Sequence, residues 1–304
     1  MNQTRRAFLT SALASVALPL WAQAPTQSLR PVLRSDALGP KPLPGEGDVI
    51  AASKFQGDLC FVILDAAGEV LAAQQPDRPM PPASVAKIVT ALYALDALGE
   101  GFTFDTKLFV LGEVTEGVLE GDVVLAGSGD PTLASEDFKA MIAKLKELGI
   151  EKVDGRFMFF DAALHYLKSI EPGQPTWVGY SPAISGLNLN YNRVHFEWKP
   201  VGGSWTLSME ARGTGASPRG GVSRMRIATR ETPVFTYETK DAADLWSVAK
   251  SALGKGGARW LPVRFPGHYA ADAFRVMARD AGVALPPAAP LSVMPEGEAV
   301  YTHQ

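Results

Sequence analysis

The 304-residue sequence has few side chains that could form covalent cross-links or bind a metal ion. Its single cysteine, Cys60, cannot form a disulfide within the chain, and its place in the apolar run 59–64 predicts a small core residue. The four histidines have no metal-ligand spacing, which disfavours a zinc site: His165, His195, His268 and His303. We therefore expect no cofactor, and a fold that is stabilised by an ordinary hydrophobic core.

The sequence is also poor in excess positive charge. The formal net charge is −3, and residues 1–24 carry only Arg5 and Arg6, so the remainder is at −3 − 2 = −5. This balance argues against nucleic acid or an anionic membrane surface as a partner.

Two common motifs of enzymes are also missing from the sequence. The glycines at 127 and 129 lack the spacing of a nucleotide-binding loop, and no Gly-x-Ser-x-Gly elbow of an α/β-hydrolase is present.

The N-terminus has the pattern of an export signal. Arg5 and Arg6 form a twin-arginine motif, an apolar stretch follows at residues 12–21, and small residues stand at 22–24. Cleavage after Ala24 would leave Pro25 just beyond the cut, so cleavage after Ala22 is the alternative. The apolar stretch is too short to span a membrane. We expect a protein that is exported to the periplasm.

The length and the hydrophobic content of 46% predict two domains. After a proline-rich arm at 25–50, strands are expected at 58–65 and 70–74, and a helix is expected from about Ser84 to 98, ended by Gly99. The later residues favour strands, including one at 187–198, and a turn-rich segment at 112–121. Two amphipathic helices are expected, one at 135–148 with Ser135 as its cap and Leu148 on its buried face, and one at 266–282.

The first turn of the Ser84 helix combines a hydroxyl and an amine. Ser84 and Lys87 are three residues apart, which places both on one helix face. The helix is apolar all round except at Ser84, Lys87, Thr90 and Asp96, so we expect it to be buried and Lys87 to lose solvation, which favours its neutral, proton-accepting form. A nucleophile beside a base is suited to covalent acyl transfer. The alternative is that Ser84 only caps the helix and Lys87 extends to solvent.

These residues resemble those of a known family. The hairpin followed by Pro-Ala-Ser-Val-Ala-Lys at 82–87 is similar to penicillin-binding proteins and serine β-lactamases. Several later motifs look like the inserted domain of the class C low-molecular-mass penicillin-binding proteins, the D-alanyl-D-alanine carboxypeptidase/endopeptidases: residues 122–133, 149–161, 180–192, 266–271 and 281–283. The resemblance implies a mixed α/β (α+β) fold, in which part of a transpeptidase domain carries a large, mostly β insertion.

The resemblance also implies a mechanism and a set of partners. Ser84 would form an acyl-enzyme with peptidoglycan stem peptides or, as inhibitors, β-lactam antibiotics, and Lys87 would take the serine proton. Asp130, in a Gly-Ser-Gly-Asp-Pro turn, is a candidate for binding an amine of the peptide, although capping of the turn before Pro131 is the favoured interpretation. A β-lactamase proper is disfavoured by the long insertion.

The family's Ser-x-Asn and Lys-Thr-Gly elements are absent from these 304 residues, and Lys255-Gly256-Gly257 is a poor substitute for the latter. We therefore expect a C-terminally truncated chain, with a signal at 1–24, the start of the peptidase domain at 25–100, the insertion at 101–290 and the beginning of a return to the peptidase domain at 291–304. Its function would be that of a serine-type carboxypeptidase/endopeptidase or, alternatively, of a non-catalytic fragment that binds peptidoglycan or a partner. Because the Ser-x-Asn and Lys-Thr-Gly elements that would cover the Ser84 helix are missing, its apolar side chains are predicted to be exposed in this chain.

Overall fold

The structure is a computed structural model that describes residues 46–304. The predicted export signal and most of the proline-rich arm lie outside the described residues. The chain divides into two compact units, Met1–Thr90 and Ala91–Gln304, and the expected boundaries at 24, 100 and 290 stay predictions. Within residues 46–304, no helix has the length and apolar character needed to cross a membrane.

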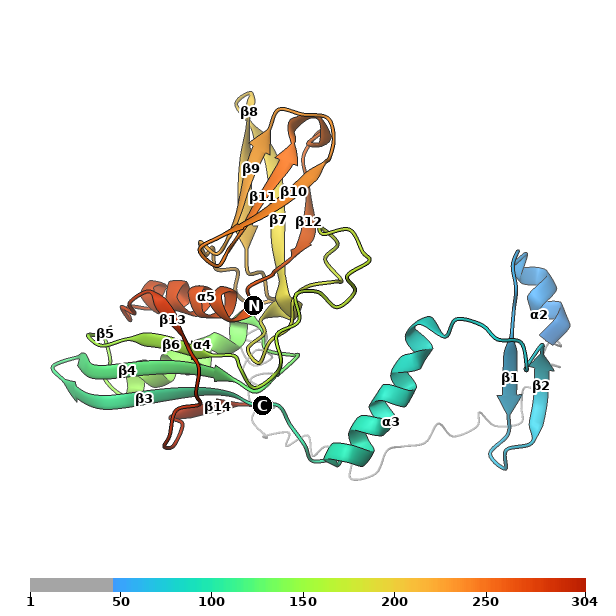
Figure 1. The fold of residues 1–304 in the computed structure, drawn as a ribbon, viewed down its shortest axis with the longest axis horizontal. Coiled ribbons are helices and arrows are strands. Elements are labelled where there is room, and N and C mark those ends of the chain that lie inside the picture. Colours follow the sequence, from blue (N-terminus) through green and yellow to red (C-terminus); the bar gives the residue numbers. More distant parts are fainter. Residues whose placement is uncertain (1–45) are drawn as a thin grey trace, which may run out of the picture. The chain divides into compact units, whose positions relative to one another are not determined.

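The described part of the first unit contains helix α2 (Glu46–Ser53) and the predicted hairpin (Figure 1). Strands β1 (Phe61–Leu64) and β2 (Val70–Gln74) pair antiparallel. The Asp65 carboxylate closes their turn, because it accepts main-chain N–H bonds from Ala67 at 2.8 Å and Glu69 at 2.9 Å. This confirms the hairpin, whereas Cys60, just before β1, is only half-buried and was wrongly predicted to be a core residue.

Helix α3 (Ala86–Leu98) follows a 3-10 turn at Ala83–Val85 that contains Ser84. Gly99 ends it in a left-handed conformation (φ +84°), with its N–H donating to Leu95 O at 3.0 Å, as the sequence predicted. The described residues bury none of the α3 side chains. The exposure expected of this helix in the present chain is confirmed at Val85, Ile88, Val89, Leu92 and Leu95, each at least 53% exposed.

A six-stranded sheet forms the base of the second unit, in the order β13-β6-β4-β3-β14 with β5 (Lys152–Val153) beside β4. Its long hairpin joins β3 (Thr106–Thr115) and β4 (Val118–Gly127). The remaining strands, β6 (Phe157–Phe160), β13 (Ala288–Leu291) and β14 (Tyr301–His303), extend the sheet on both sides. Residues 301–303, placed by the sequence in a return to the peptidase domain, therefore pair with β3.

The expectation of a turn-rich segment at 112–121 was wrong. Gly112 and Gly121 lie directly opposite each other within β3 and β4, and the turn is confined to Glu116 and Gly117, both with positive φ. A Cβ on Gly121 would lie 1.9 Å from the main-chain oxygen of Leu111. These glycines are present because the two backbones approach closely, not because the chain turns there.

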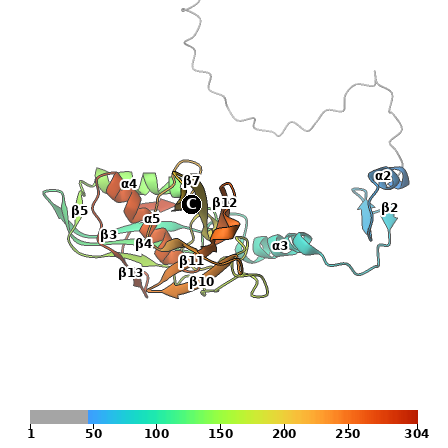
Figure 2. The ribbon, with the colours of Figure 1, turned by 90° about the horizontal axis from the view of Figure 1, so that it is seen from above.

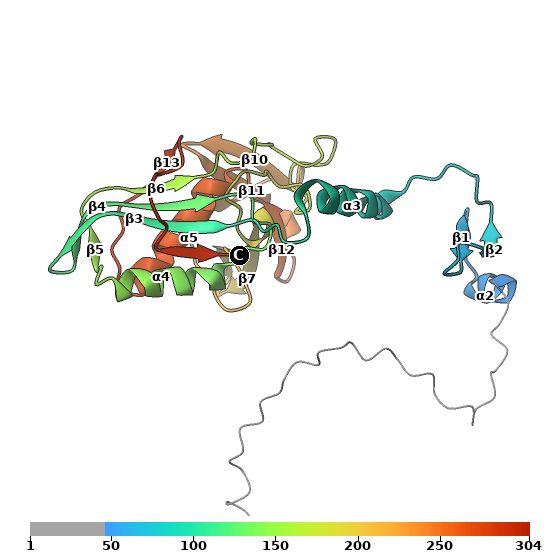
Figure 3. The same ribbon diagram turned by 90° about the horizontal axis from the view of Figure 1, so that it is seen from below.

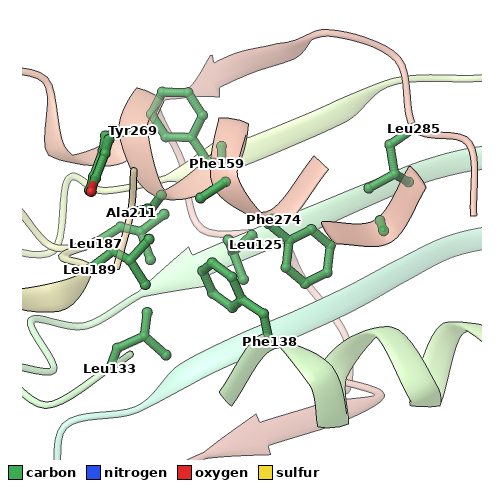
Figure 4. Close-up of a cluster of buried hydrophobic side chains, with 14 of the residues drawn as sticks. Leu125, Leu133, Phe138, Phe159, Leu187, Leu189, Ala211, Tyr269, Phe274 and Leu285 are labelled. Carbon is green, nitrogen blue, oxygen red and sulfur yellow. The ribbon is translucent and has the colours of Figure 1, made fainter. Parts of the chain in front are cut away.

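Two helices, α4 (Phe138–Glu147) and α5 (Pro266–Asp280), cover one face of this sheet (Figures 2 and 3). Between them and the strands, the rings of Phe274 and Phe138 meet edge-to-face with their centres 5.1 Å apart (Figure 4). The Phe274 ring also stacks on that of Phe157, with 5.7 Å between the ring centres. Alternate residues of the strands face the other way and form a smaller cluster around Val124 and Met158. The sheet therefore buries side chains on both of its faces.

Two details of the predicted amphipathic helices differ from expectation. Ser135 does not cap the first of them, because its hydroxyl donates to Ala211 O at 2.8 Å, while Asp137 binds the N–H of Ala134 at 2.8 Å. Leu148 is exposed, since Gly149 ends the helix just after it with φ +77°. The other predicted helix is confirmed as α5.

Two three-stranded sheets complete the second unit. One, in the order β12-β7-β8, contains β7 (Arg193–Val201), β8 (Ser204–Glu210) and β12 (Gly257–Pro262). The other, in the order β10-β11-β9, contains β9 (Ser223–Ala228), β10 (Phe235–Lys240) and β11 (Ala243–Ala249). The chain thus has a mixed α/β fold whose second unit is mostly β, as the sequence predicted. Residues 187–192, expected as strand, instead include a left-handed turn at Asn190–Asn192.

Candidate functional site

The start of α3 brings together the two residues that the sequence singled out. Ser84 lies in the 3-10 turn, and Lys87 lies in the first turn of the helix. The Lys87 Nζ donates to the Ser84 Oγ at 3.0 Å. This distance is short enough for direct proton transfer between a serine nucleophile and a lysine base.

The surroundings of this pair differ from the expectation. Both side chains are exposed among the described residues, so the loss of solvation predicted for Lys87 is not provided by residues 46–304. The apolar neighbours of the pair on α3 are exposed as well, Val85 at 65% and Ile88 at 62%. Desolvation of Lys87 would need a further surface to cover this end of the helix.

Asp130 lies in the turn that follows β4, and it is only 3% exposed. Its Oδ1 accepts hydrogen bonds from the main-chain N–H of Thr132 at 2.8 Å and from the Thr132 hydroxyl at 2.7 Å. Its Oδ2 lies 3.7 Å from His303 Nε2, which is also 3.6 Å from Asp137. These contacts agree with the favoured interpretation of Asp130 as a turn cap, and its role toward substrate stays a prediction.

Two buried residues, Asp244 and Arg264, hold part of the second unit in place through separate sets of hydrogen bonds. Asp244 is completely buried, and its carboxylate accepts from the Arg264 main-chain N–H at 3.1 Å and the Tyr237 hydroxyl at 2.8 Å. Burial raises the pKa of Asp244 to about 6. The Arg264 guanidinium donates to three main-chain oxygens of the long loop at 168–181, at 2.7 to 2.9 Å.

In the described part of the chain, no three histidine, cysteine or acidic side chains form a group that could hold a metal ion.

A cleft of about 460 Å³ in the second unit was not predicted from the sequence. Its lining includes Tyr191 and Arg193, next to the left-handed turn, and Trp260 in β12. The only sequence signal was the asparagine-rich stretch 188–192, because asparagine tolerates positive φ better than most residues. That signal does not reveal that Trp260, from a strand much later in the chain, would lie beside Arg193.

A family model and two curated relatives all match the chain to D-Ala-D-Ala carboxypeptidases. The model of the D-Ala-D-Ala carboxypeptidase 3 (S13) family matches residues 49–216, more than half of the chain. The D-alanyl-D-alanine carboxypeptidase DacB of Haemophilus influenzae is 37% identical over 73 residues, which are 24% of this chain and 15% of the relative. A D-alanyl-D-alanine carboxypeptidase of an Actinomadura species is 36% identical over 131 residues, 42% of this chain and 24% of the relative.

The fold also matches a solved structure. The crystal structure of penicillin binding protein 4 from Haemophilus influenzae superposes with a TM-score of 0.58 at 20% identity, over 78% of this chain and 54% of that one. The same protein has been solved in complex with a β-lactam. The present chain thus matches about half the length of this structure and less than a quarter of each of the two curated relatives.

Proposed function

The chain belongs to the D-Ala-D-Ala carboxypeptidase 3 (S13) family, and from this premise we propose that it contributes the nucleophile and base of a serine-type D-Ala-D-Ala carboxypeptidase/endopeptidase that acts on peptidoglycan peptides. The observation that carries the proposal is the 3.0 Å hydrogen bond from Lys87 Nζ to Ser84 Oγ. A hydroxyl and an amine in direct contact at the start of a helix provide the two groups needed to form an acyl-enzyme.

In the proposed reaction, the neutral amine of Lys87 takes the proton of Ser84 while Oγ attacks the carbonyl carbon of the penultimate D-alanine. A C–O bond forms, the C–N bond to the terminal D-alanine breaks, and the leaving amine receives the proton. Water then attacks the ester, which releases the shortened peptide and restores Ser84. A β-lactam would acylate Ser84 by the same attack, with its ring nitrogen as the leaving group.

The twin-arginine pattern at Arg5 and Arg6 supports the further proposal that the protein acts in the periplasm, where peptidoglycan lies. Asp130 would bind an amine on the peptide through its carboxylate. Its Oδ2 lies 3.7 Å from His303 Nε2 but has no hydrogen-bond partner among the described residues, which supports a role beyond the turn.

The alternative proposal is a non-catalytic fragment that binds peptidoglycan or a partner protein. It is favoured by the bare surface of α3, none of whose side chains is buried by the described residues. An acyl-enzyme site that cannot exclude water would leave the Lys87 amine in contact with solvent, without the desolvation that favours the proton-accepting form of a lysine.

Labelling with a fluorescent penicillin separates the two proposals. Covalent labelling of the folded chain that disappears in Ser84→Ala, and persists in Thr90→Ala, would support the enzyme. Thr90 is a matched control because its hydroxyl lies on the same helix but donates to Ala86 O. No labelling of folded wild-type protein, either alone or mixed with a polypeptide that carries the family's Ser-x-Asn and Lys-Thr-Gly elements, would refute an acylating role for this chain and leave the binding fragment.

A further inference from the structure

The cleft found in the second unit is built from segments that are distant in sequence. It is lined by residues before α4, by the turn that carries Tyr191, by Arg193 at the start of β7, by the loop at 212–214, and by Trp260. Its volume of about 460 Å³ lies in the range of small-molecule sites, and aromatic and charged side chains meet in it. None of these residues belongs to the Ser84–Lys87 pair.

Of the two arginines in the described lining of this cleft, Arg193 is the one that is not hydrogen-bonded to a carboxylate of the described residues. Its guanidinium carbon lies 5.2 Å from the ring centre of Tyr191 and 5.2 Å from that of Trp260. Its buried Nε has no hydrogen-bond acceptor within residues 46–304. Arg212, the other arginine of the lining, is already occupied, because it donates to Glu210 at 2.6 and 3.2 Å and contacts His195 at 3.2 Å. An anion entering the cleft would therefore pair with Arg193.

Tyr191 is held at the cleft in an unfavourable backbone conformation. Its φ is +57°, and its neighbours Asn190 and Asn192 also have positive φ. The turn is maintained by the buried amide of Asn190, which bonds to the N–H and the hydroxyl of Ser135 at 3.1 and 2.8 Å. Tyr191 is nevertheless 64% exposed. Glycine or asparagine would suit such a backbone better, so the exposed ring itself points to a binding function.

A carboxylate in the lining limits which anions fit. Glu136 Oε1 accepts hydrogen bonds from the main-chain N–H of Thr214 at 3.2 Å and from its hydroxyl. These bonds lower the pKa of Glu136, so it stays ionised. An ionised acceptor repels a polyanion such as a phosphate-rich ligand, but it accepts hydrogen bonds from hydroxyl or amide N–H groups. The lining therefore suits a ligand with one negative charge and several donors.

We propose that this cleft binds a sugar that carries a single carboxylate, with the carboxylate on Arg193, the ring against the exposed face of Tyr191, and hydroxyl or acetamido N–H groups directed to Glu136. The sugar acid of this chemistry in peptidoglycan is a muramyl unit without its stem peptide, because in a peptide-bearing unit the lactyl carboxyl group is bound to the peptide as an amide; that choice rests on the function proposed above. The cleft would then hold a peptide-free part of the glycan while the Ser84 site acts on peptides.

The test is ligand-observed saturation-transfer NMR on the full chain with N-acetylmuramic acid. N-acetylglucosamine, which lacks only the lactyl ether group that carries the carboxylate, is the matched ligand, and the dipeptide D-Ala-D-Ala provides a carboxylate without a sugar. Arg193→Gln should weaken binding of N-acetylmuramic acid by about tenfold or more, because it removes a charge-assisted contact. Arg259→Gln is the control, since the Arg259 guanidinium also lies over two aromatic rings, at 4.7 Å from the ring centres of Trp177 and Phe235, but Arg259 does not line the cleft.

A second variant guards against a folding defect in Arg193→Gln. Tyr191→Asn keeps a residue that tolerates the left-handed turn and removes the ring, so thermal unfolding should stay near that of wild type while binding weakens. The proposal is overturned if N-acetylglucosamine binds with the same affinity as N-acetylmuramic acid, if D-Ala-D-Ala displaces N-acetylmuramic acid from the cleft, or if none of the three ligands binds. It is also overturned if Arg193→Gln and Arg259→Gln change the affinity for N-acetylmuramic acid equally. Penicillin labelling at Ser84 is measured separately, so failure of the cleft and failure of the proposed enzyme remain distinguishable.

Discussion

The main-chain N–H of Arg264 donates to the fully buried carboxylate of Asp244 at 3.1 Å, which ties the end of the β12 segment to β11. Despite this bond and the hydrogen bond from Tyr237, burial dominates and raises the pKa of Asp244 from 3.8 to about 6. The folded protein therefore holds a proton at Asp244 more tightly than the unfolded chain does.

This shift predicts a pH dependence of stability. Because the folded pKa is raised, the contribution of Asp244 is fully present below pH 3.8 and is lost as pH rises through about 6. The loss amounts to about 3 kcal/mol of unfolding free energy, since each pKa unit is worth about 1.4 kcal/mol. Chemical denaturation at several pH values should show this decline in wild type and not in Asp244→Asn. Parallel pH profiles for the two proteins would contradict the assignment.

Substitution of Lys87 should separate its role as a base from its role as a positive charge. Arginine keeps the charge but does not give up its proton at usable pH, so Lys87→Arg should lower the rate of acylation by penicillin nearly as much as Lys87→Ala, about 100-fold or more. The rate of covalent labelling is the measurement. Near-normal labelling of Lys87→Arg would mean that Lys87 acts only as a fixed cation.

The opposed glycines of the β3–β4 hairpin should tolerate no side chain. A Cβ on Gly121 would meet main-chain oxygen, which cannot move without shifting the strand, so Gly121→Ala should cost at least about 2 kcal/mol. Gly101→Ala is the control, because nothing lies within 4 Å of a Cβ there. Thermal unfolding compares the two, and equal melting temperatures would show that the strands separate more easily than the structure indicates.

The sequence predicted those features that depend on neighbours along the chain. The Ser84–Lys87 contact follows from the three-residue spacing of a helix, and the β1–β2 hairpin follows from its turn residues. The Asp130 turn also closes over two residues, from Asp130 to Thr132. In each case the partner lies within a few positions, so the pattern contains the geometry.

Features that depend on distant segments could not be read in the same way. Gly112 and Gly121 resemble turn residues until the opposing strand is known to approach closely. The Asn190–Asn192 turn replaces a predicted strand because Asn190 bonds to Ser135, 55 positions earlier. The cleft at Arg193 likewise requires Trp260, which only the pairing of β12 with β7 places there.

Asp130 offers a test of substrate recognition. Asp130→Asn keeps an oxygen for the two hydrogen bonds from Thr132 and removes the charge. If the carboxylate binds a peptide amine, kcat/KM should fall by about tenfold for a peptide with a free side-chain amine, since hydrogen bonds to charged groups are worth about 1.5–3 kcal/mol. A peptide with that amine acetylated should be unaffected. Equal changes for the two peptides would leave Asp130 as a turn residue only.

The bare surface of α3 leads to the last prediction. Val89 and Leu92 are 71% and 62% exposed, and exposed apolar surface of this extent promotes association. In this chain, Val89→Lys combined with Leu92→Lys should reduce aggregation, measured by light scattering, and leave the melting temperature nearly unchanged, because neither side chain is buried. Leu125→Lys, at a position that is 0% exposed, should instead unfold the second unit.

Mixed with a polypeptide that carries the family's Ser-x-Asn and Lys-Thr-Gly elements, wild type should gain penicillin labelling, whereas the double variant should not, because the lysines would be buried by that partner. A double variant that loses stability on its own would show that residues of this chain already cover α3, and the need for a further wall would be refuted.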